Sequence, residues 1–455
     1  MSSPGRATVQ GLGHFGGGVG VARFLVREGW EVTVTDLQSA EQLADSIAAL
    51  EDLDLRLALG GHDPADFTHT DLVVANPAVD PEDKHLRAAR AAGVRIVTEI
   101  GLFLERCPAR VAAVTGTQGK SSTAHFLHQL LVAADIPARI GGNIGGSLLG
   151  ELREMRSEEL CVVELSSYQL VGLSCELAEA TLDLGIITNL REDHLERHGT
   201  VDSYHAAKLE LLSLLRAGAP LLLGEGVAER ARSLAPDAAE RADIHEAGAL
   251  LRIEDAHFTL RGEVLGKTSA ASKLPEFQRE NLLLALSAAR LLGAPAKVLA
   301  ATIPTLGGLD HRHEDLGQIA DRRVYDNGVS TTPDSTEAAI DSLPEGLVLI
   351  AGGEAKALPL DGLAEKAAAR ARHIVLFGAC AEEWSTAFRD AGATCTLTTT
   401  LADAVDAAWS ASEAGDTILF SPAAASFDAY RNFSERAKDF RACIAARASM
   451  APSTS

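Results

Sequence analysis

The sequence predicts an α/β protein with three consecutive domains, each built on a sheet of mainly parallel strands. Short apolar runs of strand length alternate with segments of helical periodicity along most of the chain. Two glycine-rich turns each join a predicted strand to a predicted helix. The length of 455 residues also exceeds what a single hydrophobic core usually supports. We therefore expect a Rossmann-like domain over 1–107, a central domain with a phosphate-binding loop and a parallel sheet over 108–306, and a second Rossmann-like domain over 307–455.

The first predicted domain begins with a nucleotide-type turn. Gly11, Gly13 and Gly16 form the pattern G-x-G-x-x-G after a short strand, and a helical run follows them. The next strand ends in Asp36, 20 residues beyond Gly16, where a dinucleotide-binding fold places its ribose-contacting acid. The pattern predicts a pyrophosphate near a helix N-terminus. The alternative is a tight strand-to-helix turn that binds no ligand.

The rest of this domain alternates strand and helix. We expect a strand over 71–75, a helix over 81–92 and a strand over 94–98. Cys107-Pro108 is a plausible boundary, because proline interrupts the pattern just before the next strand.

The second glycine-rich turn starts the central domain. A strand ending at Thr115 leads into a loop, and a helical run follows the loop. The glycines allow backbone N–H groups to surround an anion, the lysine supplies a mobile cation and a serine hydroxyl can bind Mg²⁺. The strict phosphate-loop pattern would have a first glycine where this chain has Val114. The alternative is a glycine-rich turn with an exposed lysine. The loop consists of Gly116, Thr117, Gln118, Gly119, Lys120, Ser121 and Ser122.

Several polar side chains follow further strands of the central domain. Glu164 follows a strand over 160–163, and Asp193 and His194 come soon after a strand over 184–188. Asn143 lies in a glycine-rich loop. Because the loops after parallel strands line one crevice, these residues are expected to share a cleft with Lys120 and to suit Mg²⁺. Taken alone, Glu164 could instead be a helix-capping or surface carboxylate.

The remaining central segment and the third domain continue the α/β pattern. We expect a helix over 204–215 carrying Lys208, which by itself is typical of a solvated helix face, and a helix over 281–292. Strand patterns then occur over 324–325, 347–350, 374–377 and 417–420. Helical stretches separate these strands, so the third domain is predicted to be a second doubly wound sheet.

Composition restricts the possible partners. The net charge of −22 argues against a nucleic-acid or anionic-membrane surface. No apolar run approaches the ~20 residues that a membrane span needs. The six cysteines form no C-x-x-C pair, and no signal peptide opens the sequence. We expect a cytoplasmic protein with reduced thiols, without membrane insertion and monomeric.

The motifs together resemble a known family. Gly116-Thr117-Gln118-Gly119-Lys120-Ser121 is similar to the G-T-x-G-K-[ST] loop of the Mur ligases. Three stretches resemble the next motifs of that family and occur in its order: Gly142-Asn143-Ile144-Gly145, Glu164-Leu165-Ser166-Ser167-Tyr168-Gln169-Leu170 and Glu192-Asp193-His194. The E-L-S-S-[FY]-Q-L form is typical of the glutamate-adding members. So are Ser421-Pro422-Ala423-Ala424-Ala425-Ser426-Phe427-Asp428 and Asn432-Phe433-Ser434-Glu435-Arg436.

The resemblance, which covers nearly the whole chain, implies an activity. It implies ATP-dependent ligation of glutamate to UDP-N-acetylmuramoyl-L-alanine (UDP-MurNAc-L-Ala) through an acyl phosphate, in the synthesis of peptidoglycan precursors. ATP and Mg²⁺ would be required. The partners would be these small molecules and no nucleic acid.

The resemblance also implies roles for individual residues. Lys120, Glu164, His194 and Lys208 would be catalytic, and Ser121, Glu164, His194 and a carbamylated Lys208 would bind metal. The ATP site would comprise Gly116, Thr117, Gln118, Gly119, Lys120, Ser121, Ser122, Asn281, Arg312 and Asn327. Gly13, His14, Phe15, Asp36 and Asn143 would contact the UDP substrate, and Lys356, Ser426 and Phe433 would hold glutamate.

The chain departs from the family pattern at three places, and the first is the run of extra glycines from Gly16 to Gly18 in the UDP-binding domain. Asn327-Gly328-Val329 stands where members usually show D-S-K, with neighbouring Asp326 a candidate for the missing acid. Phe277-Gln278 stands where the asparagine motif usually begins His-Asn. No residue pattern fixes the enantiomer of glutamate, so a ligase adding L-glutamate stays open, as does a non-catalytic nucleotide-binding protein.

Other functional classes explain less of the sequence. An NAD-dependent dehydrogenase would account for the first 40 or so residues and leave the Lys120 loop unexplained. A folylpolyglutamate-synthase-like enzyme would lack the N-terminal G-x-G-x-x-G turn, and a diaminopimelate- or lysine-adding Mur ligase would show D-N-P-R in the third domain.

Overall fold

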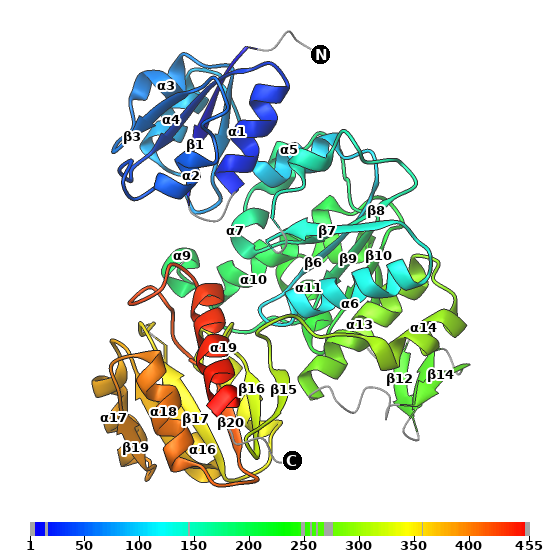
Figure 1. Cartoon of the computed structure of the whole chain (residues 1–455). Helices are drawn as coiled ribbons and strands as arrows, with labels where there is room; N and C mark the ends of the chain where they lie inside the picture. Colours follow the sequence, from blue (N-terminus) through cyan, green and yellow to red (C-terminus); the bar gives the residue numbers. More distant parts are fainter. Residues whose placement is uncertain are drawn as a thin grey trace. The chain divides into compact units, whose positions relative to one another are not determined.

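The computed structural model describes residues 5–13, 17–143, 146–246, 251–254, 257–260, 263–267, 276–356 and 358–450. The chain forms two compact units (Figure 1). Unit 1 comprises Met1–Leu274 and Gln278–Leu306, and unit 2 comprises Pro275–Phe277 and Gly307–Ser455.

The first sheet of unit 1 is parallel and has the strand order β3-β2-β1-β4-β5. Alternate residues of its strands face opposite layers. Leu72 and Val74 pack with the helix α1, whereas Val73 packs with α3 and α4. The strands are β1 (Arg6–Gln10), β2 (Glu31–Asp36), β3 (Arg56–Leu59), β4 (Leu72–Ala75) and β5 (Arg95–Thr98). The helices are α1 (Gly17–Arg27), α2 (Ala44–Ala48), α3 (Pro64–Thr68), α4 (Lys84–Ala91) and α5 (Glu99–Arg106).

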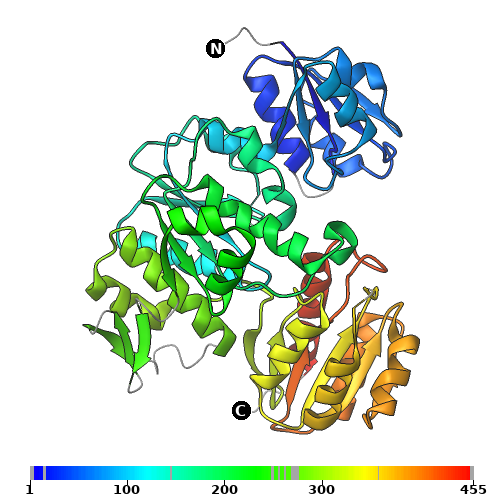
Figure 2. The same cartoon turned by 180° about the vertical axis from the view of Figure 1, so that it is seen from behind.

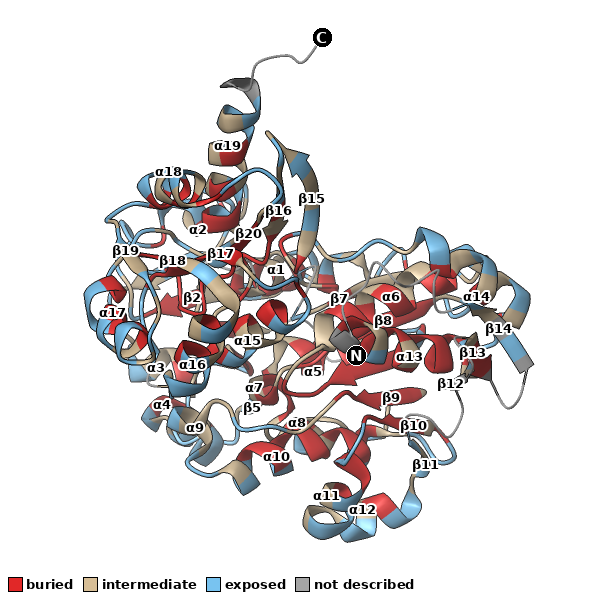
Figure 3. Cartoon of the chain, turned by 90° about the horizontal axis from the view of Figure 1, so that it is seen from below, coloured by how far each residue is buried: buried red, intermediate tan, exposed pale blue. Residues whose placement is uncertain are grey.

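The second sheet of unit 1 is also parallel, in the order β11-β10-β9-β6-β8-β7. Its middle strands are buried on both faces, which explains their nearly continuous apolar sequences (Figure 3). The strands are β6 (Arg110–Thr115), β7 (Ala138–Gly142), β8 (Leu160–Glu164), β9 (Leu184–Ile187), β10 (Pro220–Leu223) and β11 (Asp243–Glu246).

Helices cover the second sheet on both faces. On one face α6 and α13 pack against alternate β6 residues such as Val114. The helices are α6 (Lys120–Ala133), α7 (Ser167–Leu170), α8 (Leu173–Glu176), α9 (Leu195–His198), α10 (Val201–Leu209), α11 (Val227–Leu234), α12 (Pro236–Arg241), α13 (Glu276–Leu291) and α14 (Ala296–Thr302). Short 3₁₀ turns cover Leu149–Glu151, Glu210–Leu214 and Ile303–Thr305.

A small antiparallel sheet lies beside α14 (Figures 1 and 2). Its order is β12-β13-β14, with β12 (Leu251–Glu254), β13 (His257–Leu260) and β14 (Glu263–Lys267). The sequence predicts the first two of these strands, at 250–253 and 257–260.

Unit 2 contains a mixed sheet in the order β15-β16-β20-β17-β18-β19, in which only the β15–β16 pair is antiparallel among the described strands. The helices α15, α16 and α17 cover one face, and α18 and α19 cover the other. The strands are β15 (Glu314–Ile319), β16 (Arg322–Asp326), β17 (Leu347–Gly352), β18 (Ala371–Phe377), β19 (Cys395–Leu397) and β20 (Thr417–Phe420). The helices are α15 (Pro333–Asp341), α16 (Asp361–Arg370), α17 (Ala381–Asp390), α18 (Leu401–Ala411) and α19 (Phe433–Met450).

The predicted α/β fold class is confirmed, and individual elements differ from the prediction. The helix predicted over 204–215 is α10 followed by the 3₁₀ turn Glu210–Leu214. The sheet of unit 2 includes the antiparallel strand β15, so it is not wholly parallel. The domain limits 1–107, 108–306 and 307–455 stay predictions. Across the described residues, every helix is too short or too polar to cross a bilayer.

Candidate functional site

The predicted phosphate-binding loop, residues 116–122, lies at the carboxyl end of β6, inside the second sheet. Gly116 and Gly119 both have positive φ, 139° and 80°, a region that glycine adopts without steric cost. A Cβ atom on Gly116 would overlap the Thr188 hydroxyl, and one on Gly119 would overlap the amide of Asn281. The loop therefore requires glycine at both positions. The predicted ATP-binding Asn281, on α13, lies directly against it.

A second loop fixes the shape of the first. Backbone and side chain of Asn189, which follows β9, accept hydrogen bonds from Thr117 N and Gln118 N, both at 3.0 Å. The Thr117 hydroxyl accepts a hydrogen bond from Arg191 N at 3.0 Å. Asn189 and Arg191 were not singled out from the sequence. Their partners lie more than 70 residues away in the chain, which no local pattern reveals.

Lys120 is the first residue of α6, so its ammonium group lies at the positive end of a 14-residue helix. Its Nζ donates to the Thr117 carbonyl at 2.8 Å, which folds the side chain back over the loop. Ser121 is half-buried and Ser122 is buried in the same first turn. Backbone N–H groups and a cation at one helix start are the features that suit the binding of an anion.

Glu164 ends β8, the strand next to β6. Its side chain is buried. One carboxylate oxygen, Oε1, accepts a hydrogen bond from the Asn143 amide at 2.9 Å. The other, Oε2, has no hydrogen-bond partner among the described residues. The surface or capping alternative therefore does not describe Glu164, because its carboxylate is directed inward beside the phosphate-binding loop.

Lys208 on α10 is 1% exposed, so it is not a solvated helix residue. Its Nζ donates to the Gly116 carbonyl at 2.7 Å and lies 4.6 Å from the centre of the Tyr204 ring. Burial, followed by the positive charge of Lys120, lowers the pKa of Lys208 well below its usual value. Asp193 and Glu164 act in the opposite direction. These four charged groups thus interact electrostatically within one part of unit 1.

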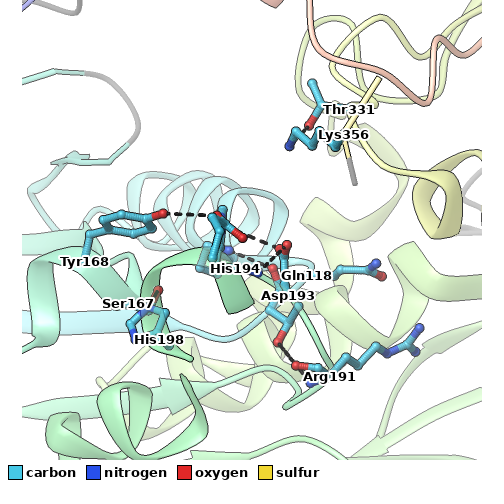
Figure 4. A network of polar contacts seen from close by, with 12 residues as sticks. Gln118, Ser167, Tyr168, Arg191, Asp193, His194, His198, Thr331 and Lys356 are labelled. Atoms are coloured by element: carbon cyan, nitrogen blue, oxygen red, sulfur yellow. Dashed lines mark hydrogen bonds and ion pairs between the residues drawn. The ribbon is translucent and has the colours of Figure 1, made fainter. Parts of the chain in front are cut away.

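His194 lies in the same region, in a polar network with its neighbours (Figure 4). The Glu196 carboxylate lies 3.3 Å from His194 Nδ1 and accepts from the Tyr168 hydroxyl at 3.5 Å. Asp193 Oδ2 lies 3.5 Å from His194 Nε2. The backbone of His194 is left-handed, with φ of 52°, which is strained for a non-glycine residue. In this conformation the imidazole ring of His194 contacts the Tyr168 ring in a T-shaped arrangement, with the ring centres 5.3 Å apart.

A second histidine, which sequence reasoning missed, adjoins this network. His198 Nε2 lies 3.1 Å from the Ser167 hydroxyl, and its ring packs on Tyr168 and Tyr204. Burial lowers the pKa of His198, and so do its electrostatic interactions with His194 and Lys208. Among the described residues, no three His, Cys, Asp or Glu side chains are grouped to hold a metal ion by themselves.

The predicted UDP-contacting residues belong to two parts of unit 1. Asp36 ends β2, and its carboxylate accepts from Leu12 N at 2.8 Å and from Gly13 N at 3.3 Å, so it fixes the glycine turn. His14 and Phe15 lie outside the described residues. Asn143 follows β7 and contacts Glu164 as above.

The predicted glutamate residues all lie in unit 2. Lys356 Nζ donates to the Thr331 hydroxyl at 3.3 Å (Figure 4). Ser426 is buried after β20, whereas Phe433 begins α19 with 41% of its surface exposed.

The segment that departs from the family pattern is buried in unit 2. Asn327 accepts from His313 N at 3.0 Å and donates to the Ser421 hydroxyl at 2.9 Å, so both ends of its amide are engaged. The Asp326 carboxylate is fully buried and accepts from Arg441 Nε at 2.8 Å and Gly328 N at 2.9 Å, with His311 Nδ1 at 2.6 Å. Arg312, predicted to contact ATP, is half-buried next to His311.

Family models match three successive parts of the chain. They are the MurD-like N-terminal domain of Mur ligases over residues 5–98, the Mur ligase middle domain over 114–289 and the Mur ligase glutamate ligase domain over 311–424.

Full-length relatives extend this similarity. UDP-N-acetylmuramoylalanine–D-glutamate ligase of Geobacter metallireducens is 34% identical over 438 residues, which is 94% of both chains. The enzyme of the same name from Symbiobacterium thermophilum is 33% identical over 97% of this chain and 98% of its own.

Solved structures share the fold at low sequence identity. UDP-N-acetylmuramate-alanine ligase MurC of Thermotoga maritima aligns with a TM-score of 0.60 and 17% identity, covering 96% of this chain and 98% of its own. MurF ligase of the same organism, in complex with ADP, aligns with a TM-score of 0.60 and 15% identity over 92% and 95%. The three matched domains and the full-length relatives lead to one conclusion: this chain belongs to the Mur ligase family.

Proposed function

We propose that this protein is an ATP-dependent ligase that joins D-glutamate to UDP-MurNAc-L-Ala in peptidoglycan precursor synthesis. The relatives that match nearly the whole chain carry this activity in their names. The observation that carries the proposal is the buried carboxylate of Glu164 beside the phosphate-binding loop, with one oxygen lacking a partner among the described residues. Ligases of this family use ATP, and we place the reaction in the cytoplasm, in a monomer.

The first chemical step is phosphoryl transfer to the substrate carboxylate. A carboxylate oxygen of UDP-MurNAc-L-Ala attacks the γ-phosphorus of ATP, the bond to the β,γ-bridging oxygen breaks, and ADP leaves with the electron pair. The start of α6 and the loop N–H groups hold the phosphates, and Lys120 neutralises charge that develops on the transferred group. Thr117 and Gln118 shape this loop through their contacts with Asn189, Ser122 is buried beside it, and Asn281 packs against it.

The residues present suit Mg²⁺. Buried Glu164 offers a carboxylate oxygen that has no hydrogen-bond donor among the described residues, and Ser121 lies in the first turn of α6. Mg²⁺ commonly binds through one or two carboxylates together with substrate phosphates, so a group of three acidic residues is not needed. When bound, the ion would supply positive charge to the phosphates during transfer. Glu164, Ser121, His194 and Lys208 would hold it.

Lys208 is proposed to act as a carbamate. Its lowered pKa favours the neutral amine, the form that attacks CO₂ to give a carbamate and release one proton. The product is an anion with two oxygens, next to Lys120. This removes the repulsion between the two lysines and adds an oxygen ligand for Mg²⁺.

The second step forms the amide. The amine of glutamate attacks the acyl carbon, and phosphate leaves as the C–O bond breaks. Lys356, Ser426 and Phe433 would hold glutamate, Arg312 and Asn327 would serve ATP, and Gly13, His14, Phe15 and Asp36 would hold the UDP end. Because the protein holds both reactants, attack by the amine is effectively unimolecular, and it competes with hydrolysis of the acyl phosphate.

Phosphate release tests the proposal. We expect release only when UDP-MurNAc-L-Ala, ATP, Mg²⁺ and D-glutamate are present together, with ADP and the amide product formed in equal amounts. Preference for L-glutamate would establish the L-adding variant. Binding of ATP without turnover on either enantiomer would favour a nucleotide-binding protein without catalysis, and would refute the proposal.

A further inference from the structure

Arg436 is the largest fully buried side chain of the described chain, with 0% of its surface exposed. Its guanidinium donates to backbone carbonyls from three loops of unit 2. The closest acceptors are Ala425 O, 2.9 Å from Nη1, and Ala424 O, 3.0 Å from Nη2. Longer contacts of 3.4 to 3.5 Å reach Gly352, Gly328 and Ser330. One guanidinium therefore joins the chain segments that leave β16, β17 and β20.

The position of this cation is unfavourable in two respects. Arg436 lies in the first turn of the 18-residue helix α19, where the helix dipole repels positive charge. It is also removed from water, and burial lowers its pKa to about 10, so it is still protonated near neutral pH. No carboxylate is among its hydrogen-bond partners in the described residues, and five carbonyl dipoles take that place. A residue needed only for packing would not require a charge here.

The three loops carry the residues assigned to glutamate. Ser426 directly follows Ala425, and Thr331, the partner of Lys356, directly follows Ser330. Lys356 comes two residues after Glu354, which pairs with Ala425 in both directions at 2.9 Å. Phe433 precedes Arg436 by three residues, one turn of α19.

The packing around the guanidinium leaves little room for movement. A Cβ atom on Gly353 would lie 2.8 Å from Arg436 Nη1 and would overlap Ala425 O. The β17 loop therefore approaches the arginine through a glycine, at φ of 133°. A displacement of Arg436 would shift all three loops at once.

We propose that Arg436 is a positioning residue for the amino-acid pocket: it fixes the three loops so that Thr331, Lys356, Ser426 and Phe433 keep one geometry toward glutamate. This inference rests on the proposed function of unit 2. Arginine suits the role because its planar fork presents several N–H groups in fixed directions, whereas lysine keeps the charge without the fork.

The test compares Arg436→Lys with Arg447→Lys in the full-length protein. Arg447 is on the same helix and pairs with Asp406 on α18, away from the three loops, so it is a matched control. For Arg436→Lys we expect the KM for D-glutamate to rise about 10- to 100-fold, with the KM values for ATP and UDP-MurNAc-L-Ala within about twofold. Acyl-phosphate formation without glutamate, trapped with hydroxylamine, should keep its wild-type rate. Arg447→Lys should match the wild type throughout.

Two outcomes would overturn the inference: an unchanged KM for glutamate, or an equal rise for all three substrates in a folded variant. Wild-type inactivity with either glutamate enantiomer would instead reject the proposed function, so the two failures are distinguishable. If Arg436→Lys does not fold, hydrogen–deuterium exchange on the wild type, with ADP and UDP-MurNAc-L-Ala present, decides the question. Joint protection of 328–331, 352–356 and 424–433 on adding D-glutamate supports the coupling. Protection of one segment alone contradicts it.

Discussion

At the scale of single residues, the candidate site depends on charges that the fold forces together. Lys120 and Lys208 are both directed to backbone carbonyls of the same loop, those of Thr117 and Gly116. Two cations this close repel, and Glu164 and Asp193 only partly offset that repulsion for Lys208. Bound phosphate or a carbamate would relieve it, so the arrangement favours added negative charge.

The first prediction concerns Lys120. Lys120→Ala should lower kcat by about 10²–10³, because a cation that stabilises the transferred phosphoryl group is lost. Lys84→Ala is the matched control, since Lys84 is an exposed lysine that also begins a helix. Steady-state phosphate release measures both, and the circular dichroism spectrum should be unchanged. Near-wild-type turnover of Lys120→Ala would remove this lysine from the mechanism.

The second prediction concerns Lys208. Lys208→Ala should be inactive, and short carboxylic acids such as acetate should restore part of the activity by replacing the carbamate oxygens in the space left by the side chain. Lys120→Ala serves as the control, because it lacks a cation and should gain nothing from acetate. The measurement is phosphate release over a series of acetate concentrations. Full activity without acetate would mean that Lys208 has no part in metal binding.

At the scale of elements, two glycines that precede helices allow the effect of backbone strain to be distinguished from the effect of close packing. Gly119 before α6 and Gly226 before α11 both have left-handed φ, 80° and 74°. A Cβ at Gly226 would meet nothing within 4 Å, whereas one at Gly119 would overlap Asn281. The pair therefore distinguishes backbone strain from the close approach of α13.

From this pair we predict unequal effects. Gly226→Ala should lower the free energy of unfolding by about 1 kcal/mol, from backbone strain, and leave kcat unchanged. Gly119→Ala should lower it further and reduce kcat by at least about 10², since the phosphate-binding loop must move. Urea unfolding and phosphate release provide the two measurements. Equal behaviour of the two variants would show that the contact with Asn281 is unimportant.

A fourth prediction concerns the start of α5. Glu176 Oε2 accepts from Thr98 N at 2.7 Å and from the Thr98 hydroxyl at 2.9 Å, and burial raises the pKa of this carboxyl to about 7. Between the unfolded and folded pKa values the folded state binds the extra proton, so this group's stabilisation is present at low pH and is lost as pH rises toward 7 and above.

Glu176→Gln should remove that pH dependence. The variant should match the wild type at about pH 5 and have a free energy of unfolding about 1–3 kcal/mol higher at about pH 8. Glu179→Gln, an exposed neighbour, is the control. Urea titrations at both pH values test the prediction. A wild-type advantage at the higher pH would contradict it.

The success of sequence reasoning also varied by element. Buried strands such as β6 and β8 have continuous apolar runs, so their positions were predicted. The strand β3 was missed although Leu55, Leu57 and Leu59 alternate with Arg56 and Ala58 there, and β15 was missed because it is largely polar. Such strands form because a neighbouring strand offers backbone hydrogen bonds, which is information from the tertiary structure.

At the scale of the whole molecule, local motifs predicted which residues matter but not how they are supported. The Lys120 loop was recognisable because its pattern is local. The contacts of Asn189 with Gln118 and of Arg436 with Gly328 join segments 71 and 108 residues apart, so they appear only in the folded chain. Asp326, considered as a replacement acid, proves to be surrounded by His311 and Arg441.

The net charge of the whole molecule has the same sign as the charges of the proposed substrates, so it repels them. The chain carries −22, while ATP, glutamate and UDP-MurNAc-L-Ala are all anions. At about 10 mM ionic strength the Debye length is ~30 Å, so acidic residues far from the site repel an approaching substrate; at about 100 mM it is ~10 Å. Contacts with Lys120 act over a few ångströms and are screened much less.

We therefore predict that kcat/KM for UDP-MurNAc-L-Ala rises about 2- to 10-fold between these ionic strengths, while kcat at saturation stays constant. Initial rates in potassium chloride, at fixed Mg²⁺, provide the measurement. A steady fall in kcat/KM would mean that the local cations dominate the field that the substrate meets.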